Sequence, residues 1–269
     1  MRTSRLAATE AGTEPDGLLA DRDLHPVEPA LDALRGLFRR YFRVDVQGME
    51  RIPAAGPALL VANHSGGGWS PDAAAFVLEF LDRFGIDRPF HFLGHATLMR
   101  TPVVGPALRR FGVIPASRAN AREAFEAGAC VMVFPGGEVE LHRPFRARNE
   151  IRFQGRTGFL EMARDTGVPL VPIVMAGGQQ TYLPITDGRR LAEITGFRRL
   201  FGVKVLPVAA GVPFGLTIGN LAGWIPLPAR LSIEVLDPVD VRRFRDLGDA
   251  YRHVTGVMQA TLTRLTDGL

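Results

Sequence analysis

Residues 58–84 read ALLVANHSGGGWSPDAAAFVLEFLDRF, an apolar run that leads through a glycine-rich turn into a segment with helical spacing. The run over 58–62 is short and wholly apolar, which indicates a strand buried in the core. Pro71 opens the segment 71–84, where a helix tolerates proline because its first backbone N–H groups have no partner within the helix. The stretch therefore predicts a buried strand, a turn and a helix in direct succession.

The same alternation of strand and helix continues along the chain. Strands are expected at 90–93, 131–134, 170–175 and 231–236, and helices at 101–111, 118–127, 158–166 and 244–265, the second of these helices capped by Ser117. Strands that alternate with helices are typical of α/β proteins, and 269 residues suffice for one substantial core. We therefore expect a single layered α/β domain with a central, mostly parallel β-sheet flanked by helices.

The two ends of the chain differ in character. Residues 1–27 are largely polar and without periodicity, so we expect a disordered tail there and the folded domain at 28–269. Arg2 and Arg5 are not followed by the apolar run of a secretory signal, which favours a cytoplasmic location. The only cysteine, Cys130, lies in an apolar strand pattern and is expected to pack in the core rather than to react.

The charge of the chain points toward anionic partners. The net charge is +4, and Lys204 is the only lysine, so nearly all of the positive charge is arginine. Guanidinium groups suit bidentate contacts with phosphate. No motif of a nucleic-acid-binding protein accompanies them, so we expect lipid rather than nucleic acid as the partner.

Two segments suggest contact with a membrane. Residues 28–44 form an amphipathic helical pattern with arginines beside leucines and aromatic residues, which suits either an interfacial helix or an ordinary helix that covers the core. Residues 206–228 carry no charge and are long enough to cross a bilayer, but four prolines and four glycines interrupt them. A membrane-facing loop or the wall of an apolar channel is favoured there over a membrane span.

His64 and Asp72 are the candidate catalytic pair. His64 follows the strand 58–62 after one residue, and the glycines after it permit close approach of a substrate. Asp72 falls in the first turn of the following helix, from which the loop can fold back to the imidazole. A carboxylate there would stabilise the imidazolium while the other ring nitrogen removes a proton from a hydroxyl. Taken alone, the pair is equally consistent with a buried histidine and a helix cap.

Three later sequence blocks strengthen the catalytic interpretation. They are FGVIPASR at 111–118, VFPGGE at 133–138 and VPLVPI at 168–173. Together with the histidine block, the chain resembles the lysophospholipid and glycerolipid acyltransferase superfamily from about Gly48 to Pro238. The resemblance implies transfer of a fatty-acyl group from acyl-CoA or acyl-carrier protein to a glycerolipid or lysophospholipid hydroxyl. It also implies a peripheral or monotopic enzyme at the cytoplasmic face of a membrane.

The resemblance assigns roles to particular residues. His64 and Asp72 match the His-x4-Asp pair of the family, although seven residues rather than four separate them here, and the Gly66–Gly68 loop is expected to absorb the difference. Arg118 matches the arginine that helps to hold the polar head of the acceptor. A guanidinium does this by forked hydrogen bonds to phosphate.

The third block departs from the Phe-Pro-Glu-Gly-Thr-Arg pattern of lysophosphatidate acyltransferases. Gly136, Gly137 and Glu138 are assigned to substrate binding, and Glu138 and Glu140 are expected to repel a phosphate dianion. The block looks more like that of monoacylglycerol and diacylglycerol acyltransferase-like proteins. Arg143 is expected to supply a phosphate contact from the neighbouring loop, so a lysophospholipid acceptor remains open.

No metal or other cofactor is expected. His91 and His95 stand four residues apart, but no glutamate or cysteine completes a metal site, so structural roles are favoured. The alternatives are a noncatalytic lipid-binding module and a lysophosphatidate-specific acyltransferase. A serine hydrolase is disfavoured because the chain lacks the Gly-x-Ser-x-Gly elbow.

Overall fold

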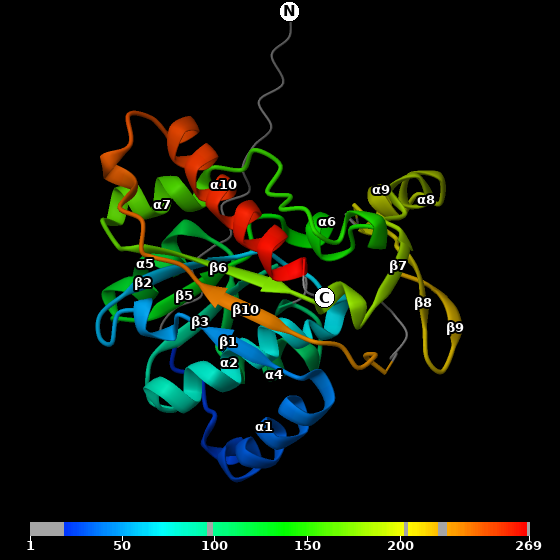
Figure 1. The fold of residues 1–269 in the computed structure, drawn as a ribbon, viewed down its shortest axis with the longest axis horizontal. Helices are drawn as coiled ribbons and strands as arrows, with labels where there is room; N and C mark the ends of the chain where they lie inside the picture. Colours follow the sequence, from blue (N-terminus) through cyan, green and yellow to red (C-terminus); the bar gives the residue numbers. More distant parts are fainter. Residues whose placement is uncertain (1–18, 96–98, 202–203, 220–224, 268–269) are drawn as a thin grey trace, which may run out of the picture.

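The computed structural model describes residues 19–95, 99–201, 204–219 and 225–267 (Figure 1). A seven-stranded sheet forms its centre, in the order β1-β10-β6-β2-β5-β3-β4. The pairs among β6, β2, β5, β3 and β4 are parallel, whereas β10 runs antiparallel to β6 and is joined by β1 in parallel. The mostly parallel sheet predicted from the sequence is therefore confirmed. The strands are β1 (Asp45–Gln47), β2 (Ala58–Ala62), β3 (Phe90–Gly94), β4 (Val113–Pro115), β5 (Cys130–Val133), β6 (Leu170–Ala176) and β10 (Ser232–Val235).

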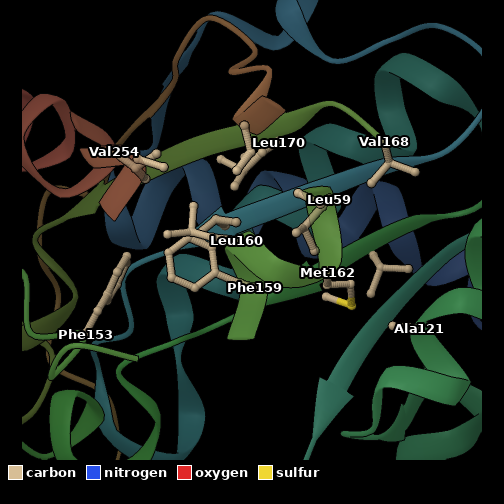
Figure 2. Close-up of a cluster of buried hydrophobic side chains, with 14 of the residues drawn as sticks. Leu59, Ala121, Phe153, Phe159, Leu160, Met162, Val168, Leu170 and Val254 are labelled. Atoms are coloured by element: carbon tan, nitrogen blue, oxygen red, sulfur yellow. The ribbon is translucent and has the colours of Figure 1, made fainter. Parts of the chain in front are cut away.

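Helices cover both faces of this sheet because side chains of its strands alternate between two cores. Leu59 and Val61 of β2 belong to a core beneath α5 (Arg118–Glu126), α7 (Gly158–Thr166) and α10 (Leu247–Thr266). Figure 2 shows Leu59 in this cluster with Leu160 and Met162 of α7. Leu60 faces the opposite core, which includes residues of α1 (Glu28–Phe42) and α2 (Pro71–Phe84). The order helix, sheet, helix is that of a three-layer α/β domain.

Most predicted elements have the expected positions. The bounds of β2, α2 and α7 match the prediction, and the other strands and helices shift by one to three residues. The Ser117 side chain caps α5 by accepting a hydrogen bond from the Asn120 N–H at 3.0 Å. The helix expected at 101–111 is shorter, with α4 at Val104–Arg110.

The described part of the expected tail is packed rather than disordered. Residues 1–18 lie outside the described residues, but Leu24 is buried and His25–Val27 form a short 3-10 helix. The Asp23 N–H donates to the Arg110 carbonyl at 3.0 Å. The Arg22 guanidinium donates to the Ile86 carbonyl at 2.8 Å. The prediction of a tail over 1–27 is therefore wrong for residues 19–27, which belong to the folded domain.

A second, three-stranded sheet was not predicted. It consists of β7 (Leu183–Thr186), β8 (Val208–Gly211) and β9 (Gly215–Ile218), all antiparallel, and it extends beyond the central sheet in Figure 1. Two short helices, α8 (Arg189–Ile194) and α9 (Phe197–Phe201), lie between β7 and β8 in the sequence. The uncharged segment 206–228 thus contains a hairpin. Among the described residues, no helix combines the length and apolarity that a membrane crossing requires.

Helix α1 covers the core, as one of the two interpretations expected, and its contact with a membrane stays a prediction. Leu31 and Phe42 are buried against the domain, whereas Leu34 is 39% and Leu37 57% exposed. The helix is joined to α2 by an ion pair between Arg39 and Glu79 at 3.1 Å. It covers the core with one part of its apolar surface and leaves two leucines on the outside.

Candidate active site

His64 lies just beyond the carboxyl end of β2, at the edge of the sheet where α/β proteins commonly bind ligands. Its imidazole stacks on the ring of Phe134, which follows β5, with the ring centroids 4.1 Å apart and the planes 18° from parallel. The histidine is half-buried. The strand β2 and the block that contains Phe134 therefore meet at this histidine, as their place in one parallel sheet requires.

Two buried charged side chains hold the backbone of His64 from opposite sides. The Glu140 Oε2 atom accepts a hydrogen bond from the His64 N–H at 3.0 Å, and the Arg143 Nη1 atom donates to the His64 carbonyl at 2.5 Å. The second Glu140 oxygen accepts from the Arg152 N–H at 2.8 Å. Glu140 is fully buried and Arg143 is 1% exposed. We refer to Glu140 and Arg143 as the His64 clamp.

The glycines of the third block make room for this clamp. Gly136 and Gly137 begin the short helix α6 (Gly137–Leu141), which carries Glu140 on its last turn. A Cβ atom on Gly136 would lie 2.3 Å from Glu140 Oε2, so no larger residue fits while the carboxylate folds back over the helix start. Gly137 has φ +55°, a conformation that favours glycine. The local structure therefore explains why glycine occupies both positions. The expected contact of these glycines with substrate stays a prediction.

The clamp corrects two expectations about charge. Burial raises the pKa of Glu140, and the nearby Arg143 charge and two backbone N–H donors partly offset this rise. Glu140 was expected to repel a phosphate and Arg143 to bind one. Instead, the Glu140 carboxylate is directed at backbone N–H groups. Arg143 donates to the carbonyls of His64, Glu140 and Arg148, so both act inside the protein.

Burial of the His64 imidazole favours its neutral form. Burial lowers the pKa of His64 to about 3, and the nearby His142 and Arg143 add to this effect. Its Nδ1 atom has no hydrogen-bond partner in the described part of the chain. His142 is also buried, which lowers its pKa to about 4, and its ring meets Tyr182 edge-on at a centroid distance of 6.0 Å. A neutral histidine has a ring nitrogen available to accept a proton.

Asp72 lies in the first turn of α2, as predicted, but in the described part of the chain it forms no hydrogen bond with the His64 side chain. Its carboxylate accepts hydrogen bonds from the Ser65 hydroxyl and from the Ala73 N–H, the latter at 2.9 Å. Burial raises the pKa of Asp72 to about 6 even though both hydrogen bonds oppose the rise. Among the described residues, no hydrogen bond joins the His64 imidazole to this carboxylate, which instead accepts from the Ser65 hydroxyl.

The glycine loop between His64 and Asp72 is tightly turned. Residues Gly67–Trp69 form a 3-10 turn, η3, directly before α2. Gly66 has φ +77°, and a Cβ atom there would lie 2.7 Å from the Pro71 ring. This turn leads directly into α2, whose first turn carries Asp72.

Two amide side chains that the sequence analysis passed over join the loop to the sheet. Asn63 exchanges two hydrogen bonds with the Met175 backbone, each of 2.8 Å, which extends the pairing of β2 with β6. Gln179 accepts from the Gly66 N–H at 3.2 Å and donates to the Arg143 carbonyl at 3.0 Å. The sequence signal that could have identified both residues is an amide side chain shortly after the end of β2 and of β6. Such a group both donates and accepts hydrogen bonds, so it can join two backbone segments.

Arg118 and Glu138 lie apart from this hydrogen-bond network. Arg118 begins α5, is largely exposed and forms an ion pair with Glu161 of α7. Glu138 is half-buried in the first turn of α6. Their assignment to substrate binding stays a prediction.

The remaining candidates have structural surroundings. His91 is buried, and its Nδ1 atom lies 3.2 Å from the Gly112 carbonyl. Cys130 is fully buried in β5, and burial raises the pKa of its thiol. Within the described ranges, no group of three or more His, Cys, Asp or Glu side chains is arranged to hold a metal ion.

Comparison with known proteins identifies similar chains. A family model described as "Acyltransferase" matches residues 43–176. An uncharacterized protein of Mycobacterium leprae is 34% identical over 77% of this chain and 53% of its own length. A Bos taurus protein named "DGAT1/2-independent enzyme synthesizing storage lipids" is 27% identical over 82% of this chain and 64% of its own length. This chain thus spans about half the length of the mycobacterial relatives it matches.

One solved structure shares the fold. The 1-acyl-sn-glycerophosphate (LPA) acyltransferase PlsC of Thermotoga maritima superposes with a TM-score of 0.55. The match covers 88% of this chain and 79% of that chain at 19% sequence identity. At this identity the likeness concerns the fold.

The His64 clamp yields a stability prediction. Glu140→Ala removes both acceptors and leaves the Arg143 charge buried without its counter-charge, so unfolding free energy should fall by about 3–5 kcal/mol. Glu140→Gln restores a hydrogen-bond acceptor but not the negative charge. Its unfolding free energy should therefore lie between those of the wild type and Glu140→Ala. Glu138→Ala, two residues earlier on the same helix, is the control. Urea denaturation measures all three, and equal effects at the two positions would contradict the clamp.

Asp72 yields a prediction about pH. Its folded pKa of about 6 lies above the ordinary value of 3.8, so the folded protein binds this proton more tightly than the unfolded chain. The resulting stability is present below pH 3.8 and is lost as pH rises through 6. Unfolding free energy of the wild type, relative to Asp72→Asn, should therefore fall by roughly 2–3 kcal/mol across this window. The titration of histidines, which both proteins contain, largely cancels when the two unfolding free energies are subtracted. A difference that does not change with pH would refute the raised pKa of Asp72.

Proposed function

We propose that this chain, whose residues 43–176 match the "Acyltransferase" family model, transfers a fatty-acyl group from an acyl thioester to the hydroxyl of a glycerolipid or lysophospholipid acceptor. The donor is acyl-CoA or acyl-carrier protein. The reaction as proposed uses no metal or other cofactor. The enzyme is proposed to act at the cytoplasmic face of a membrane, bound peripherally or as a monotopic protein, since its acceptor is a lipid.

The observation that carries the proposal is the place of the half-buried His64 imidazole, just beyond the carboxyl end of β2 and stacked on Phe134. In the proposed reaction, a ring nitrogen of His64 removes the proton from the acceptor hydroxyl as its oxygen attacks the thioester carbonyl. The tetrahedral intermediate then expels the thiolate, which takes the proton back from the imidazolium. Ester and free thiol are the products, and no acyl-enzyme forms.

Asp72 has a positioning role in this proposal. Its hydrogen bond with Ser65 joins the start of α2 to the residue next to His64. The Arg143 charge that favours ionised Asp72 also belongs to the His64 clamp. Asp72 thus acts on the imidazole through the loop rather than by direct contact.

The acceptor proposed first is a neutral glycerolipid such as a monoacylglycerol or diacylglycerol. Two observations support it: Arg143 is occupied by backbone carbonyls, and the Bos taurus relative is named for storage-lipid synthesis. A lysophosphatidate acceptor is the second candidate. The exposed guanidinium of Arg118 favours it, since such a group can bind a phosphate.

A panel of acceptors tests the proposal. The purified full chain is incubated with radiolabelled acyl-CoA or acyl-carrier-protein thioester and with monoacylglycerol, diacylglycerol or lysophosphatidate. Acyl transfer to a neutral acceptor is expected. Lipid binding without turnover of any thioester would instead indicate a noncatalytic lipid-binding module. Arg118→Ala separates the two acceptor classes, because it should raise KM only for the phosphorylated one.

His64 provides the mechanistic prediction. His64→Ala should lower kcat by about 10²–10⁴-fold, because the acceptor hydroxyl loses its general base. His253→Ala, a change at an exposed histidine of α10, should leave kcat unchanged. Circular dichroism and thermal unfolding check that both variants fold. Full activity in a folded His64→Ala protein would rule out the mechanism.

A further inference from the structure

The hairpin of β8 and β9 exposes large apolar side chains on one face. The register places Thr217 of β9 opposite Ala209 of β8, and both are buried, whereas the flanking Leu216 and Ile218 point outward at 70% and 59% exposed. At the turn, Val212 is 51% and Phe214 62% exposed. We call these four exposed residues the apolar hairpin face: Val212, Phe214, Leu216 and Ile218.

This face lacks the usual protection of an exposed sheet edge. β9 is an edge strand of its sheet, and edge strands that face water generally carry charged side chains. Residues 206–228 contain none. Aliphatic and aromatic side chains gathered on an uncharged edge indicate a surface that is covered when the protein functions.

Positive charge accompanies the same sheet. Residues 187–204, which connect β7 to β8, include five basic and two acidic residues. Asp187 pairs with Arg189 at 3.1 Å, and Glu193 pairs with Arg198 at 2.6 Å. The other three cations are Arg190, Arg199 and Lys204; all are exposed and have no ion pair in the described part of the chain. An apolar hairpin face, together with unpaired cations on the segment that connects β7 to β8, suits an anionic lipid surface.

The second sheet also begins next to the candidate active site. The short helix η5 (Gly178–Gln180) lies between β6 and β7. A Cβ atom on Gly178 would lie 2.2 Å from the Ser65 hydroxyl and 2.6 Å from Asp72 Oδ2, so this turn touches the loop that follows His64. β7 starts five residues later, at Leu183. A bilayer seated on the hairpin would therefore lie close to the residues proposed to act on lipid.

We propose that the apolar hairpin face inserts into the headgroup layer of an anionic bilayer while Arg190, Arg199 and Lys204 contact lipid phosphates. This inference rests on the proposed function in one respect, because it supplies the route by which a lipid acceptor reaches the site. A second copy of the chain is the less suitable occupant. It would bring an identical set of cations against this one, whereas anionic lipid offers the opposite charge.

Vesicle flotation tests the surface. The full chain is mixed with vesicles of phosphatidylcholine and phosphatidylglycerol, or of phosphatidylcholine alone. Binding should require the anionic lipid, and Phe214→Ser with Leu216→Ser should weaken it by about tenfold or more. Arg190→Glu with Arg199→Glu should do the same at low salt. The matched control is Val103→Ser with Phe111→Ser, at residues 82% and 53% exposed elsewhere. Unchanged flotation of the hairpin variant, or equal loss in the control, overturns the proposal.

A fluorescent label gives an independent measurement. Because Cys130 is the only cysteine and is buried, Leu216→Cys offers a single accessible thiol for an environment-sensitive dye. A blue shift with anionic vesicles is expected for this site and not for Val103→Cys. An unshifted spectrum at Leu216→Cys, or a concentration-dependent dimer that the hairpin variant abolishes, overturns the proposal.

Failure of this inference is distinguishable from failure of the proposed enzyme. His64→Ala should float with anionic vesicles as the wild type does, because binding needs no chemistry. The hairpin variant should retain turnover of monomeric short-chain thioester and acceptor and lose turnover only on vesicle-borne lipid. Equal loss on both substrates overturns the docking role.

Discussion

The candidate site depends on two opposite charges buried on either side of one residue. Outside water, an isolated carboxylate or guanidinium is costly, and each must be satisfied by hydrogen bonds. Glu140 and Arg143 meet this requirement largely with backbone groups, and His64 supplies its N–H to one and its carbonyl to the other. The Arg143 charge also favours the ionised form of the buried Glu140 carboxylate. The position of His64 is thus fixed by electrostatics rather than by packing alone.

The same arrangement accounts for the chemistry of the neighbouring groups. The Arg143 charge helps to keep His64 neutral and favours ionised Asp72, although burial is the larger influence on both. The Ser65 hydroxyl donates a hydrogen bond to the Asp72 carboxylate, which the family resemblance had assigned to the His64 imidazole. Gln179 then links the glycine loop to the Arg143 carbonyl. Loop, helix start and third sequence block form one hydrogen-bonded unit around the histidine.

The sequence predicted what local patterns and neighbouring strands determine. The bounds of β2 and α2 followed from an uninterrupted apolar run and from Pro71 at a helix start. The role of Glu140 was missed because its partner, His64, lies 76 residues away and no periodicity marks such a contact. The hairpin within 206–228 was missed because its glycines and prolines indicated breaks in the backbone. In the structure, Gly211 and Gly215 flank a turn between paired strands.

The contact between Gly136 and Glu140 has an evolutionary consequence. A side chain at position 136 and a carboxylate at position 140 would occupy the same space, since the added Cβ atom falls 2.3 Å from Glu140 Oε2. The added Cβ atom would also fall 2.4 Å from the Cβ atom of Glu140, and every residue except glycine carries that atom. Replacing or redirecting the glutamate therefore does not make room for alanine at position 136. A descendant that acquires alanine there must shift the start of α6 itself, so position 136 is expected to remain glycine for as long as this helix start is kept.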